Sequence, residues 1–266
     1  MEQHGKNPRK SVIAVIPARY ASTRLGGKLL LSLGGKPLIL HTLEQAKKAA
    51  AIDRVIVATD DERILRVVQE SGNEAVLTAA DHQSGSDRIA EVAEKLPFNS
   101  IIVNVQGDEP LIPPGTIEKA VVAMIGDDNM LMATTCEPIR EPHDILSPDV
   151  VKVVTDEKGF ALYFSRSPLP FPRDAVKRNG NLESALRNEP ELLASFKKHT
   201  GLYVYRREFL LDFTKLPQTK LERIEMLEQL RALENGTKIK VVEVEESSIG
   251  VDTAEDLERV RELLGR

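Results

Sequence analysis

The first hundred residues alternate short apolar runs with longer amphipathic stretches. Nearly continuous apolar runs are typical of strands that are covered on both faces, and apolar positions at helical spacing predict helices. The expected strands are 11–16, 54–59, 74–78 and 100–106, and the expected helices are 37–49, 60–71 and 85–95. This alternation predicts an α/β protein with a mixed, mainly parallel sheet flanked by helices. In such sheets ligands bind beyond the carboxyl ends of the strands.

From about residue 130 the pattern changes. Two apolar runs, 150–155 and 160–164, flank Asp-Glu-Lys-Gly at 156–159, which predicts a β-hairpin. Residues 168–198 are rich in Pro, Asn, Lys and Glu and are expected to form an exposed, partly helical loop. The other expected elements are strands at 201–205 and 238–244 and helices near 206–214, 219–234 and 253–264. We therefore expect a flexible tail at 1–10 and one domain at 11–266, with a β-rich insertion at about 130–205.

Composition narrows the possible partners. The formal net charge is −5 over 266 residues, which argues against general nucleic-acid or membrane-surface binding, because those functions favour basic patches. The single cysteine, Cys136, fits a reducing compartment and is expected to be buried. The start of the chain lacks the apolar core of a signal peptide, and no window approaches about 18 consecutive apolar residues. We expect a cytoplasmic protein without a membrane span.

The loop at 17–28 is the first candidate for chemistry. It follows the first expected strand and contains Arg19, Arg24 and Lys28, with two glycines before Lys28. Cations can face phosphoryl oxygens, and glycines allow backbone N–H groups to approach closely. The loop matches neither the Walker A motif nor the dinucleotide fingerprint. A solvated basic turn is the alternative, but its position after a buried strand favours a polyphosphate cradle.

Two carboxylates form the second candidate. Asp108 lies just beyond the expected strand at 100–106, and a carboxylate there suits Mg²⁺, which binds few carboxylates and shares phosphate oxygens. A helix cap is less favoured for Asp108, because a proline-rich loop precedes the next helix. Asp252 follows the last expected strand, where an N-cap is an equally good interpretation. It gains interest only as a partner of Asp108.

Residues 80–88 are polar and lie between an expected strand and an expected helix. Backbone groups there, with Gln83 or Ser84, could contact a base, and a simple capping turn explains the pattern equally well. Glu222, Glu225 and Gln229 share a helix face, with Glu228 beside them, which is normally a solvated surface.

Seven longer motifs add information that the single residues do not give. They are IPARYASTRL at 16–25, VATDD at 57–61, ADHQSGSDR at 80–88, VNVQGDEPLIP at 103–113, ALYFSRSPLP at 161–170, IEMLEQLRALENG at 224–236 and GVDTAEDLERVR at 250–261. Through these motifs the chain closely resembles the 3-deoxy-manno-octulosonate cytidylyltransferase (CMP-Kdo synthetase) family along nearly its whole length. The resemblance implies a nucleotide-diphospho-sugar transferase fold, a homodimer formed largely through the inserted β segment, and Mg²⁺-dependent conversion of CTP and Kdo to CMP-Kdo and pyrophosphate.

The resemblance also implies roles for individual residues. The nucleotide would contact Ala18, Arg19, Arg24, Lys28, Gln83, Ser84, Gly85, Arg88 and Asp108, with Asp108 and Asp252 as Mg²⁺ ligands and Arg19, Lys28, Asp108 and Asp252 as the catalytic set. The sugar acid would contact Gln106, Arg166, His199, Tyr203, Glu228 and Gln229. Arg166 would face the Kdo carboxylate, because a planar guanidinium suits carboxylates, and His199 would hydrogen-bond a sugar hydroxyl.

The sequence departs from the family pattern at two places, and two alternative functions remain open. The family pattern Arg-Leu-Pro-Gly-Lys-Pro-Leu is replaced at 24–30 by Arg-Leu-Gly-Gly-Lys-Leu-Leu, which predicts a more mobile loop at a cost of about 1 kcal/mol. The 173–198 segment is longer than the family pattern leads us to expect. A related ulosonic acid such as 8-amino-Kdo is an alternative substrate. A GT-A-like glycosyltransferase is the other alternative, although its Asp-x-Asp motif is replaced by Gln-Gly-Asp-Glu-Pro at 106–110.

Overall fold

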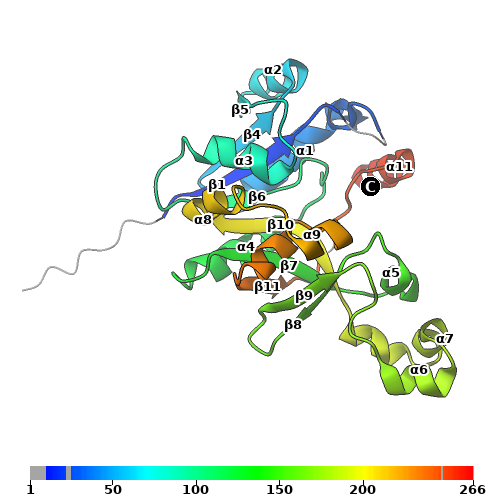
Figure 1. The fold of residues 1–266 in the computed structure, drawn as a ribbon. Coiled ribbons are helices and arrows are strands. Elements are labelled where there is room, and N and C mark those ends of the chain that lie inside the picture. Colours follow the sequence, from blue (N-terminus) through cyan, green and yellow to red (C-terminus); the bar gives the residue numbers. More distant parts are fainter. Residues whose placement is uncertain (1–9, 22–24, 247, 266) are drawn as a thin grey trace, which may run out of the picture.

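A mixed β-sheet runs through the molecule, and helices pack on both of its faces (Figure 1). The computed structural model describes residues 10–21, 25–246 and 248–265. Within these residues nine strands form one sheet, whose main path has the order β11-β7-β10-β6-β1-β4-β5. On this path β10 is antiparallel to β6 and β7, and the other described pairs are parallel. The predicted mixed, mainly parallel sheet flanked by helices is confirmed.

The elements follow the expected order along the chain. The strands of the main path are β1 (Val12–Ala18), β4 (Arg54–Thr59), β5 (Glu74–Leu77), β6 (Ile101–Asn104), β7 (Met132–Pro138), β10 (Lys197–Arg206) and β11 (Ile239–Glu243). The other strands are β2 (Ser32–Leu33), β3 (Lys36–Pro37), β8 (Lys152–Thr155) and β9 (Ala161–Ser165). The helices are η1 (Lys28–Leu30), α1 (Leu38–Lys48), α2 (Glu62–Glu70), α3 (Gly85–Ala93), α4 (Pro114–Ile125), α5 (Pro142–Leu146), α6 (Arg173–Asn179), α7 (Leu182–Asn188), η2 (Pro190–Ser195), α8 (Arg207–Phe213), α9 (Lys220–Glu225), α10 (Gln229–Glu234) and α11 (Ala254–Leu264).

The sheet separates two hydrophobic cores. Successive side chains of a strand point to opposite faces, so Val12, Ala14 and Ile16 of β1 join the core that includes α1, α4 and α11. Ile13 and Val15 face the core of α3, α8 and α10. All five side chains are almost fully buried, which explains why the sequence of β1 is apolar without alternation. Among the described residues, no helix is long and apolar enough to span a membrane.

A smaller unit extends from one end of the sheet (Figure 1). It contains α5, α6 and α7, and four buried side chains form a core of its own: Ile139, Ile145, Leu186 and Phe196. The predicted hairpin is present as β8 and β9, with the carboxylate of Asp156 accepting hydrogen bonds from the backbone of Lys158 and Phe160. At the two ends of the 130–205 segment, β7 and β10 belong to the main sheet. The segments that lie outside the main path of the sheet, which include the hairpin β8–β9 and the helices α5, α6 and α7, therefore lie between β7 and β10 in the sequence.

Two elements differ from the expectations. The single helix expected at 219–234 is two short helices, because Met226 adopts a left-handed conformation with φ of 53° and ends α9. The strand β7 had no counterpart among the expected strands. Its Thr134, Thr135 and Glu137 are buried polar residues, and Thr134 Oγ1 donates to the carbonyl oxygen of Leu202 at 2.7 Å. Hydrogen bonding within the sheet replaces the apolar pattern that normally marks a central strand.

Candidate active site

Lys28 joins two loops that are far apart in the sequence. Its Nζ lies 2.6 Å from Asp108 Oδ2 and 2.8 Å from Asp252 Oδ1. Burial, the largest single influence, lowers the pKa of Lys28, but the two carboxylates together raise it above its ordinary value. The amine is therefore charged at neutral pH. The cationic loop and both predicted carboxylates are brought together at the carboxyl ends of the strands, where a parallel sheet binds its ligands.

The backbone beneath Lys28 is defined by a glycine and an apolar anchor. Gly27 has φ of 64°, and a Cβ there would lie 3.0 Å from Tyr20 Cε2, so only glycine fits without strain. Leu29, next to Lys28, is 4% exposed and packs in the core. Arg24, the third predicted cation, lies outside the described residues. The predicted mobility of this loop stays a prediction.

The loop that contains Asp108 is held close to β1. A Cβ on Gly107 would lie 2.9 Å from the carbonyl oxygen of Pro17, so glycine permits this close approach. The carbonyl oxygen of Asp108 accepts a hydrogen bond from Val251 N at 2.9 Å, which ties the loop to the one that contains Asp252. Two backbone contacts therefore position the carboxylates independently of Lys28.

The alternative role of Asp252 as a helix cap is wrong. Thr253 is the N-cap of α11, and its hydroxyl and the Asp256 carboxylate form a capping box. The Asp252 side chain instead contacts Lys28 at 2.8 Å. Asp108 is also no cap, because α4 begins after Pro113. Both carboxylates are therefore directed into the site.

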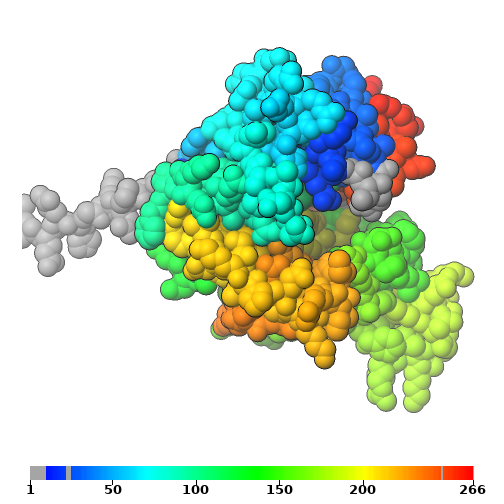
Figure 2. Space-filling model, turned by 45° about the horizontal axis from the view of Figure 1, so that its top comes forward, coloured from blue at the N-terminus to red at the C-terminus, as the bar shows by residue number. Residues whose placement is uncertain are grey.

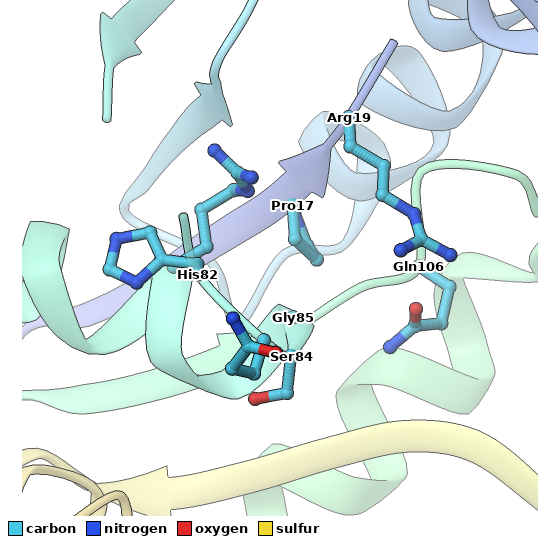
Figure 3. A pocket seen from close by; sticks show the side chains of 8 residues that line it. Pro17, Arg19, His82, Ser84, Gly85 and Gln106 are labelled. Atoms are coloured by element: carbon cyan, nitrogen blue, oxygen red, sulfur yellow. The ribbon is translucent and has the colours of Figure 1, made fainter. Parts of the chain in front are cut away.

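A cavity of about 230 Å³ adjoins the end of β1 (Figure 3). Its lining comes from the segment 17–19, the loop before α3, the start of α3 and Gln106. It consists of Pro17, Arg19, His82, Gln83, Ser84, Gly85, Arg88 and Gln106. Figure 3 shows Arg19 and Gln106 on one side and the start of α3 on the other. Ala18 is fully buried next to this lining. Of the described residues predicted for the nucleotide, all but Lys28 and Asp108 thus line one polar cavity or adjoin its lining.

Two residues of this lining also have structural roles. Ser84 is the N-cap of α3 and forms a capping box with Asp87, so the capping alternative holds for its hydroxyl. Arg88 is 4% exposed, and its Nη2 lies 2.9 Å from Asp60 Oδ2. Asp60 in turn accepts a hydrogen bond from Tyr20 N. Arg88 therefore stabilises the start of the loop 17–28 through Asp60.

A second hollow lies between the start of α3 and the helices α9 and α10 (Figure 2). This cavity measures about 380 Å³ and shares Gln83 and Ser84 with the first. Glu228 lines it and accepts a hydrogen bond from Ser86 Oγ at 2.7 Å. Burial raises the pKa of Glu228. Its Oε1 and the neighbouring Gln229 Nε2 are buried with no hydrogen-bond partner among the described residues.

His199 and Tyr203 lie on β10, on either side of an irregularity in its pairing with β7. The His199 ring lies between Phe164 and Tyr203, and its Nε2 is 2.9 Å from Thr134 Oγ1. Burial lowers the pKa of His199 to about 3 and raises that of Tyr203 well above its ordinary value. Both rings are therefore neutral near pH 7, and the low pKa makes the His199 ring too weak a base to favour general base catalysis, so hydrogen bonding suits it better.

Arg166 does not join these groups through its guanidinium. Its Nε donates to the carbonyl oxygen of Glu225 at 2.7 Å, and its Nη1 donates to that of Pro148 at 2.9 Å. Nη2 lies 3.4 Å from the carbonyl oxygen of Met226. The fork predicted to bind a carboxylate is therefore engaged with the turn that separates α9 from α10.

Glu109 was missed by the sequence reasoning. It follows Asp108, and a Cβ on Gly201 would lie 3.4 Å from its Oε1. Burial raises the pKa of Glu109 to about 7. Its place beside Asp108 in Gln-Gly-Asp-Glu-Pro was the available signal. Gln106, on the other side of Asp108, donates to Asn104 Oδ1 at 3.1 Å and faces Gly201.

A lysine between two converging carboxylates and a polar cavity at the ends of parallel strands are the features expected of a nucleotidyltransferase. The cytidylyltransferase family model matches residues 13–239. The 3-deoxy-manno-octulosonate cytidylyltransferase of Trichlorobacter lovleyi is 53% identical over 251 residues, which are 94% of this chain and 97% of that protein. That of Geobacter sulfurreducens is 51% identical over 254 residues, with coverages of 96% and 99%.

A solved structure adds a third comparison. It is a CMP:2-keto-3-deoxy-manno-octonic acid synthetase complexed with CTP, 42% identical, with a TM-score of 0.86. The match covers 96% of this chain and 99% of that one. The chain therefore belongs to the 3-deoxy-manno-octulosonate cytidylyltransferase family, and the predicted family membership is confirmed.

Proposed function

We propose that this enzyme transfers the cytidylyl group of CTP to the anomeric C2 hydroxyl of Kdo and releases pyrophosphate. Family membership supports this reaction, and the observation that carries it is the convergence of Lys28, Asp108 and Asp252. Two of the loops that supply these residues also supply Arg19 and Gln106 to the polar cavity. The product, CMP-Kdo, is an activated sugar acid for lipopolysaccharide synthesis. The enzyme acts in the cytoplasm as a homodimer. Exposed apolar side chains on and after β9, Leu162 and Phe171, support a dimer surface in this region.

The reaction is an in-line displacement at the α-phosphorus. The C2 hydroxyl oxygen forms the new bond to phosphorus and loses its proton, and the bond to the pyrophosphate oxygen breaks. No covalent enzyme intermediate is required, so the protein positions the reactants and stabilises phosphoryl charge. Arg19, which lines the cavity, and Lys28 supply positive charge for the triphosphate.

The carboxylates of Asp108 and Asp252 fit a Mg²⁺ ion. Both place an oxygen within hydrogen-bond distance of the same nitrogen, so their donors converge on one cation. Among the described residues no three His, Cys, Asp or Glu side chains form a metal cage. An ion held here therefore takes its other ligands from phosphate and water, as Mg²⁺ commonly does. Bound Mg²⁺ would polarise phosphoryl oxygens and acidify the attacking hydroxyl.

The sugar acid is held by polar groups around Gln106 and β10. Gln106, neutral His199 and Tyr203 hydrogen-bond its hydroxyls, and Glu228 Oε1 and Gln229 Nε2, which have no hydrogen-bond partner among the described residues, provide further contacts. Arg166 supports the sugar site indirectly, because its guanidinium holds the backbone of Glu225 and Met226, just before Glu228. This role replaces direct contact with the Kdo carboxylate.

Phosphorus-31 NMR tests the reaction and the acceptor together. With CTP, Mg²⁺ and Kdo, we expect the CTP resonances to be replaced by one phosphodiester and one pyrophosphate resonance. The same sample without Kdo is the control and is expected to keep its CTP. An equal concentration of 8-amino-Kdo is expected to react more slowly. Faster turnover of 8-amino-Kdo would instead assign that sugar as the substrate, and consumption of CTP without any sugar acid would refute the proposal.

A further inference from the structure

The Lys28 ammonium lies between the two carboxylates proposed to bind the metal. It contacts Asp108 and Asp252 at 2.6 and 2.8 Å. The side chain of Lys28 is 13% exposed, while those of Asp108 and Asp252 are 29% and 44% exposed. The carboxylates are thus open to solvent, whereas the ammonium is largely enclosed between them. One positive charge already occupies the point on which both acids converge.

A metal ion and this ammonium compete for the same carboxylate oxygens. Mg²⁺ binds carboxylates at about 2.0–2.1 Å, and a second cation within hydrogen-bond distance of the same oxygens repels it. Metal binding therefore requires the Lys28 side chain to move away. An anionic triphosphate offers the ammonium a new partner, because lysine binds phosphate as a mobile point charge.

The backbone restricts this movement to the side chain. Leu29 is buried in the core, and η1 is closed by hydrogen bonds from Leu30 N to the carbonyl oxygen of Gly27 and from Leu31 N to that of Lys28. The Asp108 loop remains joined to the Asp252 loop through the hydrogen bond from Val251 N to the Asp108 carbonyl oxygen. The carboxylates therefore stay close together when the lysine side chain leaves.

We propose that Lys28 is an internal cation that blocks the metal position until a nucleoside triphosphate draws it away. The inference rests on the proposed function and deepens it by setting the order of binding. Free Mg²⁺ binds the empty enzyme weakly, and the metal enters together with the triphosphate. Lys28 thus prevents metal loading before the substrate is present and then becomes a ligand of the phosphates.

Mn²⁺ binding measured by electron paramagnetic resonance tests this order without using activity. In the absence of nucleotide, we expect Lys28→Met to bind Mn²⁺ at least about tenfold more tightly than the unmodified enzyme, because the competing cation is gone. Lys28→Gln, which keeps a polar side chain, is expected to show the same direction. Lys36→Met is the matched control, since Lys36 pairs with Glu44 at 2.6 Å and not with either acid. It should bind Mn²⁺ like the unmodified enzyme.

A double variant assigns the gained binding to this site. Lys28→Met combined with Asp108→Asn should lose the tighter Mn²⁺ binding, and addition of CTP should tighten Mn²⁺ binding to the unmodified enzyme. Circular dichroism of each variant checks that the fold is intact. Equal Mn²⁺ affinity of the unmodified enzyme and both Lys28 variants without nucleotide would overturn the blocking role. That result would leave the proposed reaction standing, because the reaction is judged separately by pyrophosphate release from CTP and Kdo.

Discussion

The proposed nucleotide side and the proposed sugar side of the site are built differently. On the nucleotide side, Lys28, Asp108 and Asp252 come from loops at strand ends and are paired with one another while partly open to solvent. On the proposed sugar side, His199 and Glu228 are hydrogen-bonded to Thr134 and Ser86, and the neighbouring ion pair of Arg231 and Glu222 is buried, with side chains 7% and 6% exposed. Charged groups in open loops can be exchanged for ligand groups, whereas buried groups also support the fold. We therefore expect substitutions on the two sides to affect different quantities.

The largest expected effect is on turnover at the nucleotide side. Asp108→Asn removes one charge from the pair of proposed metal ligands, and we expect kcat to fall about a thousandfold, because metal polarisation contributes several kcal/mol. The free energy of unfolding should change by less than about 1 kcal/mol, since the carboxylate is partly exposed. Pyrophosphate release and urea unfolding measure the two quantities. Asp212→Asn, at an exposed acid of α8, is the control, and near-normal turnover of Asp108→Asn would remove Asp108 from the metal site.

The next effect is on stability at the sugar side. Arg231 and Glu222 form an ion pair whose side chains are 7% and 6% exposed, and Arg231 Nε lies 2.9 Å from Glu222 Oε2. Arg231→Met leaves a buried carboxylate without its partner, so we expect the free energy of unfolding to fall by about 3 kcal/mol. Arg187→Met removes an exposed pair with Glu183 and should cost less than about 0.5 kcal/mol. Equal losses in the two variants would contradict the contrast between buried and open regions.

A pH-dependent effect also belongs to the sugar side. The pKa of His199 is lowered to about 3 by burial, so between about pH 3 and 6.5 the unfolded chain binds a proton on this ring and the folded chain does not. Stability therefore falls as the pH falls through this window. His199→Asn should reduce the loss of unfolding free energy between about pH 7 and 5, measured with urea. His143→Asn, at a histidine whose side chain is 83% exposed, should leave the loss unchanged. An unaltered loss in His199→Asn would contradict the buried neutral ring.

The smallest effect concerns the rigidity of the loop at 17–28. A Cβ at Gly26 meets nothing within 4 Å, and its φ is outside the left-handed region. Gly26→Pro should restrict the loop and lower the KM for CTP by about two- to fivefold, which corresponds to the usual proline effect of up to about 1 kcal/mol. Gly27→Ala is the opposing control, because its left-handed φ of 64° and the nearby Tyr20 ring make a side chain unfavourable. An unchanged KM in Gly26→Pro would show that the burial of Leu29 already fixes the loop.

The difference between the two sides of the site also explains which residues could be predicted from the sequence. Lys28, Asp108 and Asp252 follow apolar strands, and parallel strands end at a common edge, so their convergence follows from topology. His199, Tyr203 and Glu228 carry no local pattern that separates them from ordinary polar residues, and they were assigned through the family resemblance. The fold and the family were predicted correctly, whereas β7 was missed because its buried threonines lack an apolar pattern.

Residue type alone could not distinguish arginines that contact a ligand from arginines that stabilise a loop of the protein. Arg88 and Arg166 were both assigned to substrates, yet the described hydrogen bonds of their guanidinium groups go to protein oxygens. An arginine in a motif can hold a loop as well as a ligand, and only its contacts distinguish the two roles. The homodimer, the cytoplasmic location and the Mg²⁺ ion stay predictions. A measurement of molecular mass in solution can test the homodimer, and the experiments above can test the Mg²⁺ ion.

Pyrophosphate release tests the central claim most directly. Each of the four nucleoside triphosphates is supplied with and without Kdo and with and without Mg²⁺, and Asp108→Asn is measured in parallel. The account predicts that, of the four nucleoside triphosphates, only CTP releases pyrophosphate rapidly, and only when Kdo and Mg²⁺ are both present. Release by Asp108→Asn is expected to be about a thousandfold slower. Release from CTP without a sugar acid, or an equal rate in Asp108→Asn, would contradict it.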